Sequence, residues 1–404
     1  MLKFFMHRHY FPLRPLYFTK KFAQLPKSVK YCCLLLFIYY LGWGMMLAYE
    51  PIYLKNVLGQ YSNIGLIATS FHILALIMSF SIGAVLDRIR KKKFLSFFLL
   101  CYLPFSYLYL HITKLWHFLL FKAYHGIIAT GLWISGEAYV RAHSPKGKEI
   151  ESIALFDIAA ILALVLGSFV GATIIDKLSF NIFYAISLFA IFALIFSLWL
   201  PDKEKESIKK IEKIELTKGI KKEIKDLRKN KKFRSSLPSL LLYVFISGSL
   251  GLVLPLFLKT LNAQLWLIGI FYGIFQTPFL FESVFATAKK KNRVLIIGWI
   301  ASCLIFLAMF FLKSISTTFL ASLLLGISFA AISPILSGRI TTAMPKTRRG
   351  EYTGILAALR YLILTLSSLV FGFMADAISL RSIFLLNFFL IVALLITMMI
   401  KKVK

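Results

Sequence analysis

Long apolar stretches recur along almost the whole chain, and they restrict the fold more than any other feature. A helix needs about 20 apolar residues to cross a hydrocarbon core of roughly 30 Å. Hydrophobic residues make up 59% of the 404 residues and charged residues only 16%. We therefore predict an all-α membrane protein with twelve transmembrane helices. The predicted spans are 31–54, 63–86, 94–112, 116–141, 152–175, 180–200, 237–258, 264–287, 294–312, 316–343, 352–375 and 380–400.

The positions of the basic residues predict how these spans are oriented. Lys and Arg number 48 against 17 Asp and Glu, and most of them lie in short polar segments between apolar stretches. Positive residues are retained on the cytoplasmic side of a membrane. With both termini inside, each outer connection holds a single basic residue, and these are Lys55, Lys114, Lys177, Lys259, Lys313 and Arg381. This distribution indicates an N-in, C-in protein, and the net charge of +31 is therefore a sign of membrane topology and not of nucleic-acid binding. We expect the protein in the plasma membrane.

An internal repeat divides the chain into two halves. Residues 51–66, PIYLKNVLGQYSNIGL, reappear at 255–270 as PLFLKTLNAQLWLIGI, and Asp176 matches Asp376 at a similar offset. Parallel six-helix repeats of this kind place a substrate site near the membrane midplane, between the halves. The predicted organisation is a tail at 1–30, helical bundles at 31–200 and 237–400, a linker at 201–236 and a basic tail at 401–404.

The N-terminal tail and the linker are the two long polar segments. The tail 1–30 is basic and aromatic, and we expect it to lie on anionic lipid at the inner face; a partner-binding arm is the alternative. In the linker 201–236, isoleucine and leucine recur at helical spacing among the charges, which predicts an amphipathic helix on the same face. A regulatory docking role is the alternative for the linker.

The segment 81–94, SIGAVLDRIRKKKF, carries a recognisable motif between the second and third spans. It resembles the G-x-x-x-D-R-x-G-R-[KR] signature of the major facilitator superfamily, although Ile89 stands where the family usually has Gly. Lys122-Ala-Tyr-His125-Gly126 lies where drug and proton-coupled members show R-x-x-Q-G. The chain therefore resembles the drug/proton-antiporter-like branch, but Ser168 replaces the Pro that exporters often carry in the fifth span.

The resemblance also implies a gate at the inner face. In the family, the motif carboxylate caps a helix of the opposite half, here the start of the eleventh span near Gly354, and a neighbouring cation meets an acid at the inner end of the fourth span. A carboxylate at a helix N-terminus gains from the unpaired N–H groups and the helix dipole. The gating residues implied in this way are Gly83, Asp87, Arg88, Arg90, Lys91 and Glu137.

Ionisable residues inside predicted spans are candidates for the substrate site, because such residues are costly in a membrane and usually face a cavity or a partner. We expect Lys122, His125 and Arg360 to line a central cavity with positive potential, suited to an anionic or polar substrate. Pairing with helix carbonyls or snorkelling is the alternative for the cations. His72, Gln276 and Trp43 are further candidates for the same cavity.

Proton coupling requires a titratable group that communicates with this cavity. His125 has a suitable reference pKa, and Asp157 is the acid that lies well inside a span, so we take these two as candidates. Glu50 and Glu282 lie close to the ends of predicted spans, where we expect a structural role, and we expect Arg339 to snorkel.

The function that this pattern favours is a secondary transporter that alternates access and exports amphipathic small molecules in exchange for protons. Uptake of a small organic anion or sugar is the first alternative. A non-transporting receptor or scaffold on a transporter fold is another. The sequence has no Walker loop, H-E-x-x-H or G-x-S-x-G motif and no cysteine spacing that suits zinc, so we expect a monomer with no cofactor, metal or enzyme activity.

Overall fold

The computed structural model describes residues 24–86, 90–145, 148–201, 230–343 and 349–403. The predicted linker and most of the N-terminal tail lie outside the described residues. Helices account for nearly all of the described chain, and no strand occurs among those residues, which confirms the all-α prediction.

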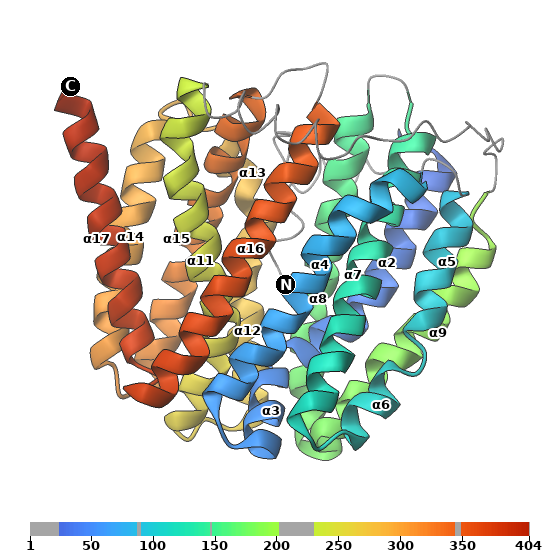
Figure 1. Ribbon diagram of the computed structural model, residues 1–404, viewed down its shortest axis with the longest axis horizontal. Coiled ribbons are helices and arrows are strands. Elements are labelled where there is room, and N and C mark those ends of the chain that lie inside the picture. The colour runs from blue at the N-terminus through green and yellow to red at the C-terminus, as the bar shows by residue number, and fades with distance from the viewer. Residues whose placement is uncertain (1–23, 87–89, 146–147, 202–229, 344–348, 404) are drawn as a thin grey trace.

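Two side-by-side groups of helices make up the molecule (Figure 1). The first group contains α2 (Lys27–Leu47), α3 (Glu50–Leu58), α4 (Tyr61–Leu86), α5 (Lys91–Cys101), α6 (Phe105–His111), α7 (Leu115–His143), α8 (Glu149–Leu178), η1 (Ser179–Phe183) and α9 (Tyr184–Leu198). The second group contains α11 (Lys231–Thr260), α12 (Leu265–Gln276), η2 (Thr277–Phe281), α13 (Glu282–Ala286), α14 (Lys291–Phe311), α15 (Ile315–Ala343), α16 (Arg349–Ala377) and α17 (Ser382–Val403).

The helices run between two opposite faces of the molecule. We call the face where α2 begins and α17 ends the terminal face, and the face that carries α3 and η1 the turn face; they are the top and the bottom of Figure 1. The two groups meet mainly where α4 packs along α16 and where α8 packs against α12. These are corresponding pairs in the two halves, as a parallel repeat requires.

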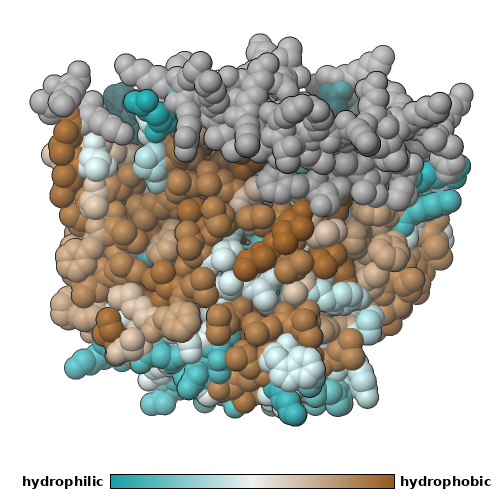
Figure 2. Space-filling view, in the orientation of Figure 1, coloured by the Kyte–Doolittle hydropathy of each residue, from teal (hydrophilic) through white to brown (hydrophobic). Residues whose placement is uncertain are grey.

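The surface between the two faces is apolar. Figure 2 shows a broad brown band above a hydrophilic rim at the turn face. The described residues contain eleven stretches long and apolar enough to cross a membrane. One of them, Glu151–Leu198, has 48 residues and includes both α8 and α9, and the chain reverses between these helices at η1 (Figure 1). Helices satisfy their own backbone hydrogen bonds, which is what a hydrocarbon environment demands.

Prolines break three segments that we predicted as continuous spans. The span 31–54 divides into α2 and α3, and Pro51 lies in the first turn of α3, where a missing N–H has no cost. The span 94–112 divides at Pro104, and the span 264–287 changes to the short helix η2 at Pro278. The prediction of single helices is wrong at these places. Proline favours a break because it removes a helical hydrogen bond and collides with the preceding turn, although α11 and α15 stay continuous through Pro238, Pro255 and Pro334.

Glycines allow close helix crossings within the first group. A Cβ atom on Gly44 of α2 would lie 2.9 Å from the Cα atom of Gly167 on α8, and a Cβ on Gly171 would lie 2.9 Å from the carbonyl oxygen of Met45. Small residues four apart let helix backbones approach in this way in membrane proteins. The resulting α2–α8 contact fixes the position of the end of α2, directly before the break at which the functional site begins.

Candidate functional site

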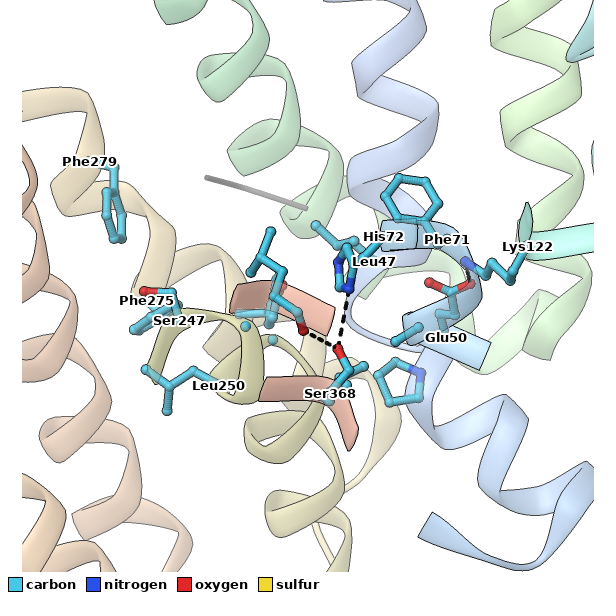
Figure 3. Close-up of a pocket in the computed structure, with 17 residues that line it drawn as sticks. Leu47, Glu50, Phe71, His72, Lys122, Ser247, Leu250, Phe275, Phe279 and Ser368 are labelled. Carbon is cyan, nitrogen blue, oxygen red and sulfur yellow. Dashed lines mark hydrogen bonds and ion pairs between the residues drawn. The ribbon is translucent and has the colours of Figure 1, made fainter. Parts of the chain in front are cut away.

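A cavity lies between the two groups of helices (Figure 3). The volume that water-sized molecules can occupy in this cavity is about 110 Å³. Much of its wall is apolar. The first group adds the charged and polar side chains of Glu50, His72 and Lys122, and the second adds the hydroxyl groups of Ser247 and Ser368. Its lining includes Leu47, Glu50, Ala68, Phe71, His72, Lys122, Ser247, Gly251, Tyr272, Phe275, Leu364 and Ser368. We call this space the polar compartment.

A second, smaller space adjoins the polar compartment, with which it shares Phe71, His72 and Leu364. Aromatic rings dominate its wall, so we call it the aromatic compartment. Its other lining residues are Tyr39, Tyr40, Trp43, Tyr102, Ala129, Thr130, Trp133 and Tyr361. On α2, α7 and α16 these residues lie nearer to the terminal face than those that line the polar compartment. The two compartments are therefore stacked along the axis that joins the two faces.

An ion pair joins the half-buried Glu50 to the buried Lys122 in the wall of the polar compartment (Figure 3). The hydroxyl of Tyr109 donates a hydrogen bond of 2.8 Å to Oε1 of Glu50. Lys122 is only 5% exposed, and its Nζ lies 5.5 Å from the ring centroid of Tyr109 and 6.0 Å from that of Trp43. Burying these charges is costly, and the mutual attraction, the hydrogen bond and the aromatic faces offset that cost.

The break between α2 and α3 positions Glu50. The glutamate is the first residue of α3, so its carboxylate also lies at a helix N-terminus, which favours negative charge. From its place near the end of a predicted span we expected a structural role, and the structure instead places it in the cavity wall. One signal in the sequence pointed to this residue: Glu50 is the only acid before Asp87, and Lys122 needs a counter-charge.

Three hydrogen bonds connect the first group to α16 around the two compartments. Ser368 Oγ and His72 Nδ1 are 3.3 Å apart (Figure 3), and Thr130 Oγ1 and the Tyr361 hydroxyl are 3.2 Å apart. Thr69 Oγ1 donates a weaker bond of 3.4 Å to the Thr365 carbonyl oxygen. Sequence reasoning singled out His72 but none of its partners on α16, because hydroxyl residues are too common in spans to indicate a site.

His125 lies behind the cavity wall and does not line either compartment. Its ring stacks on Trp43, with the centroids 4.5 Å apart and the planes 9° apart, and Phe71, Tyr102 and Phe105 surround it. The side chain is fully buried, and neither ring nitrogen has a hydrogen-bond partner among the described residues. His125 is therefore separated from the aromatic compartment by Trp43, whose indole N–H donates to the Tyr39 hydroxyl.

The other buried polar candidates also lie outside the two linings. Asp157 is buried on α8, near Cys33 and Tyr40 of α2. Gln276 ends α12 with both amide atoms buried and without a hydrogen-bond partner in the described chain, and Glu282 is buried at the start of α13. Arg339 donates to Asn292 at 2.5 Å.

The implied inner gate falls partly outside the described residues. Asp87 and Arg88 are among the residues that the structure does not describe, and Gly83 belongs to the last turns of α4. Arg90 directly precedes α5, and Lys91 is its first residue. Glu137 forms an ion pair of 2.7 Å with Arg141, one turn further along α7. The gate at this end therefore stays a prediction.

A carboxylate cap across the two groups is present at the opposite, turn face. Asp376, near the end of α16, accepts hydrogen bonds from the backbone N–H groups of Tyr61 (2.9 Å) and Ser62 (2.7 Å) at the start of α4. The Lys55 ammonium lies 3.5 Å above the ring of Tyr61. The carboxylate thus satisfies two of the N–H groups that a helix leaves unpaired, and it does so from the other half of the molecule.

Glycines bring α4 and α16 into backbone contact just inside this cap. A Cβ on Gly65 would collide with the carbonyl oxygen of Ser368 and lie 3.0 Å from the Cα of Gly372. The two helices therefore pack backbone against backbone at this crossing.

We expect Gly65→Val to open the turn face, because the added methyl groups cannot fit against α16 without separating the helices. Overpacking of this kind costs roughly 1–3 kcal/mol, and here the cost falls on the closed arrangement alone. Cysteine accessibility at Ser368 measures the opening. Gly251→Ala is the matched control, since a Cβ there meets only the Tyr272 hydroxyl, at 3.8 Å; equal labelling in both variants would contradict the expectation.

A membrane-length helical bundle that surrounds a central polar cavity is the architecture of a membrane transporter. Residues 32–288 match the family model of the Major Facilitator Superfamily. The chain belongs to this superfamily. A relative by sequence is an uncharacterised MFS-type transporter of Methanocaldococcus jannaschii, which is 24% identical over 380 residues, covering 90% of this chain and 95% of the relative.

Solved structures share the fold at low sequence identity. The nucleoside transporter NupG aligns with a TM-score of 0.71 at 16% identity, over 93% of this chain and 98% of its own. A bacterial homologue of the human lysosomal transporter Spinster, in an inward-facing and unoccupied conformation, gives 0.70 at 12%, over 92% and 94%. The human organic anion transporter MFSD10 gives 0.63 at 18%, over 91% and 100%. At these identities the likeness concerns the fold.

Proposed function

We propose that this protein is a secondary active transporter that alternates access to the central cavity and couples the export of amphipathic small molecules to protons. The Glu50–Lys122 ion pair in the wall of the polar compartment supports this proposal most strongly. Its carboxylate can accept a proton, and its loss of charge would free Lys122 to interact with a substrate or with a different partner.

The orientation follows from the positive-inside rule, which makes the terminal face cytoplasmic and the turn face external. Counting α8 and α9 separately within the 48-residue apolar stretch gives twelve candidate spans among the described residues, and this even number supports the proposal that both termini lie inside. In this orientation the Asp376 cap and the Gly65 crossing close the external side of the cavity. The motif around Asp87 then forms the corresponding closure at the cytoplasmic side in the other state.

Glu50 is the coupling residue that we favour over the two candidates from the sequence. His125 and Asp157 do not belong to either cavity lining, whereas Glu50 lines the polar compartment and has a cationic partner that responds directly to its charge. His125 remains the second candidate, because its stacking on Trp43 links any change in its charge to the aromatic compartment.

The two compartments support an amphipathic substrate. One offers an ion pair, a histidine and hydroxyl groups, and the other offers tyrosine and tryptophan rings that bind apolar or planar groups. Uptake of a small organic anion or sugar is the alternative, and relatives by fold include a nucleoside transporter and an organic anion transporter. We further propose a monomer in the plasma membrane, with anionic lipid at its basic cytoplasmic face.

Flux measurements in proteoliposomes test the proposed function. A panel of fluorescent naphthalene compounds with neutral, cationic and anionic substituents is offered under an imposed pH gradient, with the gradient collapsed by an ionophore as the control. We expect at least one compound to accumulate only while the gradient persists. Binding of panel members without any gradient-dependent flux would favour a receptor or scaffold, and flux down the substrate gradient alone would remove proton coupling.

A further inference from the structure

A buried arginine without a described counter-charge lies next to the aromatic compartment. Arg360 of α16 is 7% exposed, and its Nε is fully buried and has no hydrogen-bond partner in the described chain. The two ion pairs described above, Glu50–Lys122 and Glu137–Arg141, involve other cations, and the phenol of Tyr243, which is uncharged at neutral pH, lies near the guanidinium. Burying an isolated cation costs free energy, and an anion bound at Arg360 would offset that cost.

Helix geometry places Arg360 on the cavity-facing stripe of α16. Leu364, one turn further along, lines both compartments, and Ser368, two turns along, lines the polar compartment. Residues at this spacing lie on the same side of a helix. Arg360 therefore lies one turn beyond the shared wall in the direction of the terminal face, at the level of Tyr361 and the aromatic compartment.

The neighbouring helix α11 also has a side that faces the cavity. Ser247 and Gly251 line the polar compartment, and Tyr243, the neighbour of Arg360, lies one turn before Ser247 in the direction of the terminal face. Tyr243 is itself held by stacking on Phe329, with the ring centroids 5.4 Å apart. Arg360 and Tyr243 thus belong to two helices of the second group that pack together, whereas the rings of the aromatic compartment on α2 and α7 belong to the first group.

The charges of the site differ between the two ends of the cavity. In the polar compartment, Glu50 neutralises Lys122, so this cation is already satisfied. At the aromatic end, Asp157 is a buried acid near Tyr40, and it belongs to α8 of the first group. Arg360, in contrast, has no anionic partner among the described residues, so its charge is available to a ligand.

We infer that Arg360 and the aromatic compartment together bind an amphipathic organic anion, with the anionic group at the guanidinium and the planar apolar part among the tyrosine and tryptophan rings. A guanidinium suits this role because its planar fork binds carboxylate, sulfonate or phosphate through two parallel hydrogen bonds. The inference rests on the proposed transport function and specifies its substrate class. In this arrangement Arg360 binds the anionic group of the substrate, and the Glu50–Lys122 ion pair serves proton coupling.

The stability of the ligand-free protein gives a first test that needs no substrate. We expect Arg360→Met to raise Tm in detergent by about 2 °C or more, because the variant removes an uncompensated buried charge. Lys122→Met is the matched control, and it should lower Tm, because it leaves the half-buried Glu50 without its cation. A fall in Tm for Arg360→Met would mean that the arginine has a structural partner, and it would overturn the inference.

Binding of matched probes gives the second test. 2-Naphthoate, 2-naphthalenesulfonate and 2-naphthyl phosphate are compared with neutral 2-naphthamide by thermal shift and by quenching of tryptophan fluorescence. We expect at least one anion to bind about tenfold or more tightly than the amide, the effect of a hydrogen bond to a charged group. Arg360→Met should abolish this preference, Arg360→Lys should keep part of it, and Arg381→Gln, at the turn face, should leave it unchanged.

Two results would overturn the inference: no anion exceeding the amide in the unmodified protein, or an anion preference that survives in Arg360→Met. Neither result depends on a proton gradient. If anion binding fails while gradient-driven flux of a neutral or cationic naphthalene persists, only the substrate class is wrong. If the anion preference holds while no flux occurs, the transport function is wrong and the anion site stands.

Discussion

Glu50→Gln is expected to abolish gradient-driven accumulation of substrate while leaving exchange of substrate across the membrane intact. The amide cannot take up a proton, so the protein can still alternate but can no longer convert a pH gradient into uphill transport. The measurement is a comparison in proteoliposomes of accumulation under a pH gradient with counterflow exchange at equal pH on both sides.

The same variant also has a large expected effect on stability. Removing one member of a largely buried ion pair leaves an uncompensated charge and costs about 3–5 kcal/mol. Lys122→Met should cost a similar amount, whereas the double variant Glu50→Gln, Lys122→Met should recover most of the loss, because neither charge then remains. The free energies of unfolding of the four proteins form a double-mutant cycle. Additive losses would show that the two side chains do not interact.

Glu282→Gln is the matched control for the coupling role of Glu50. Glu282 is a buried glutamate, at the start of α13, and it does not belong to either cavity lining. Its replacement should leave the ratio of gradient-driven accumulation to exchange unchanged. If Glu282→Gln uncouples transport and Glu50→Gln does not, the coupling group lies outside the cavity and the ion pair has a structural role.

Asp376→Ala is expected to shift the protein toward an arrangement that is open at the turn face. The carboxylate accepts two backbone N–H groups of α4 from α16, and this contact exists only while the two halves meet at that face. A lost cap together with a lost charge at a helix N-terminus costs about 1–2 kcal/mol, which changes the ratio of closed to open molecules roughly 5–30-fold. Asp376→Asn should have a smaller effect, because it retains an acceptor.

Spin labels at Asn56 and Lys313 report this change, because both residues are exposed near the turn face and belong to different halves. The distance distribution in a background without native cysteines should gain a longer component in Asp376→Ala. Asp176→Asn is the matched control: it changes the corresponding residue of the first repeat, which is exposed and has no described hydrogen bond to the second half. Identical distributions for Asp376→Ala and the unmodified protein would reject the cap as a latch.

Much of the fold could be predicted because its causes are local in the chain. Apolar length predicts a membrane helix, and the motif at 81–94 together with the repeat predicted the family that the comparison confirmed. The helix breaks at Pro51, Pro104 and Pro278 could also have been predicted from these prolines, but a prediction based on hydropathy alone does not detect them. The α2–α3 break mattered most, because it brought Glu50 into the cavity.

The candidate site could be predicted only in part. Lys122 and His72 stood out because charged or titratable groups inside a span are rare, and both line the polar compartment. His125 and Gln276 stood out for the same reason, yet they do not line the two compartments, because depth in the membrane does not specify which side of a helix faces the cavity. Arg360 does not line them either, because it lies one turn beyond their shared wall on α16. Ser368 and Tyr361 gave no signal, since hydroxyl residues occur throughout the spans.

The sequence by itself determined that this chain forms a membrane-embedded helical protein of the major facilitator superfamily, because composition, motif and repeat are properties of contiguous residues. Only the tertiary structure decided which charges meet. Glu50 joins Lys122 across two helices, and Asp376 caps a helix that begins 315 residues earlier. Such pairs depend on helix rotation and on how the two halves approach each other, and both follow from the packing of the whole bundle.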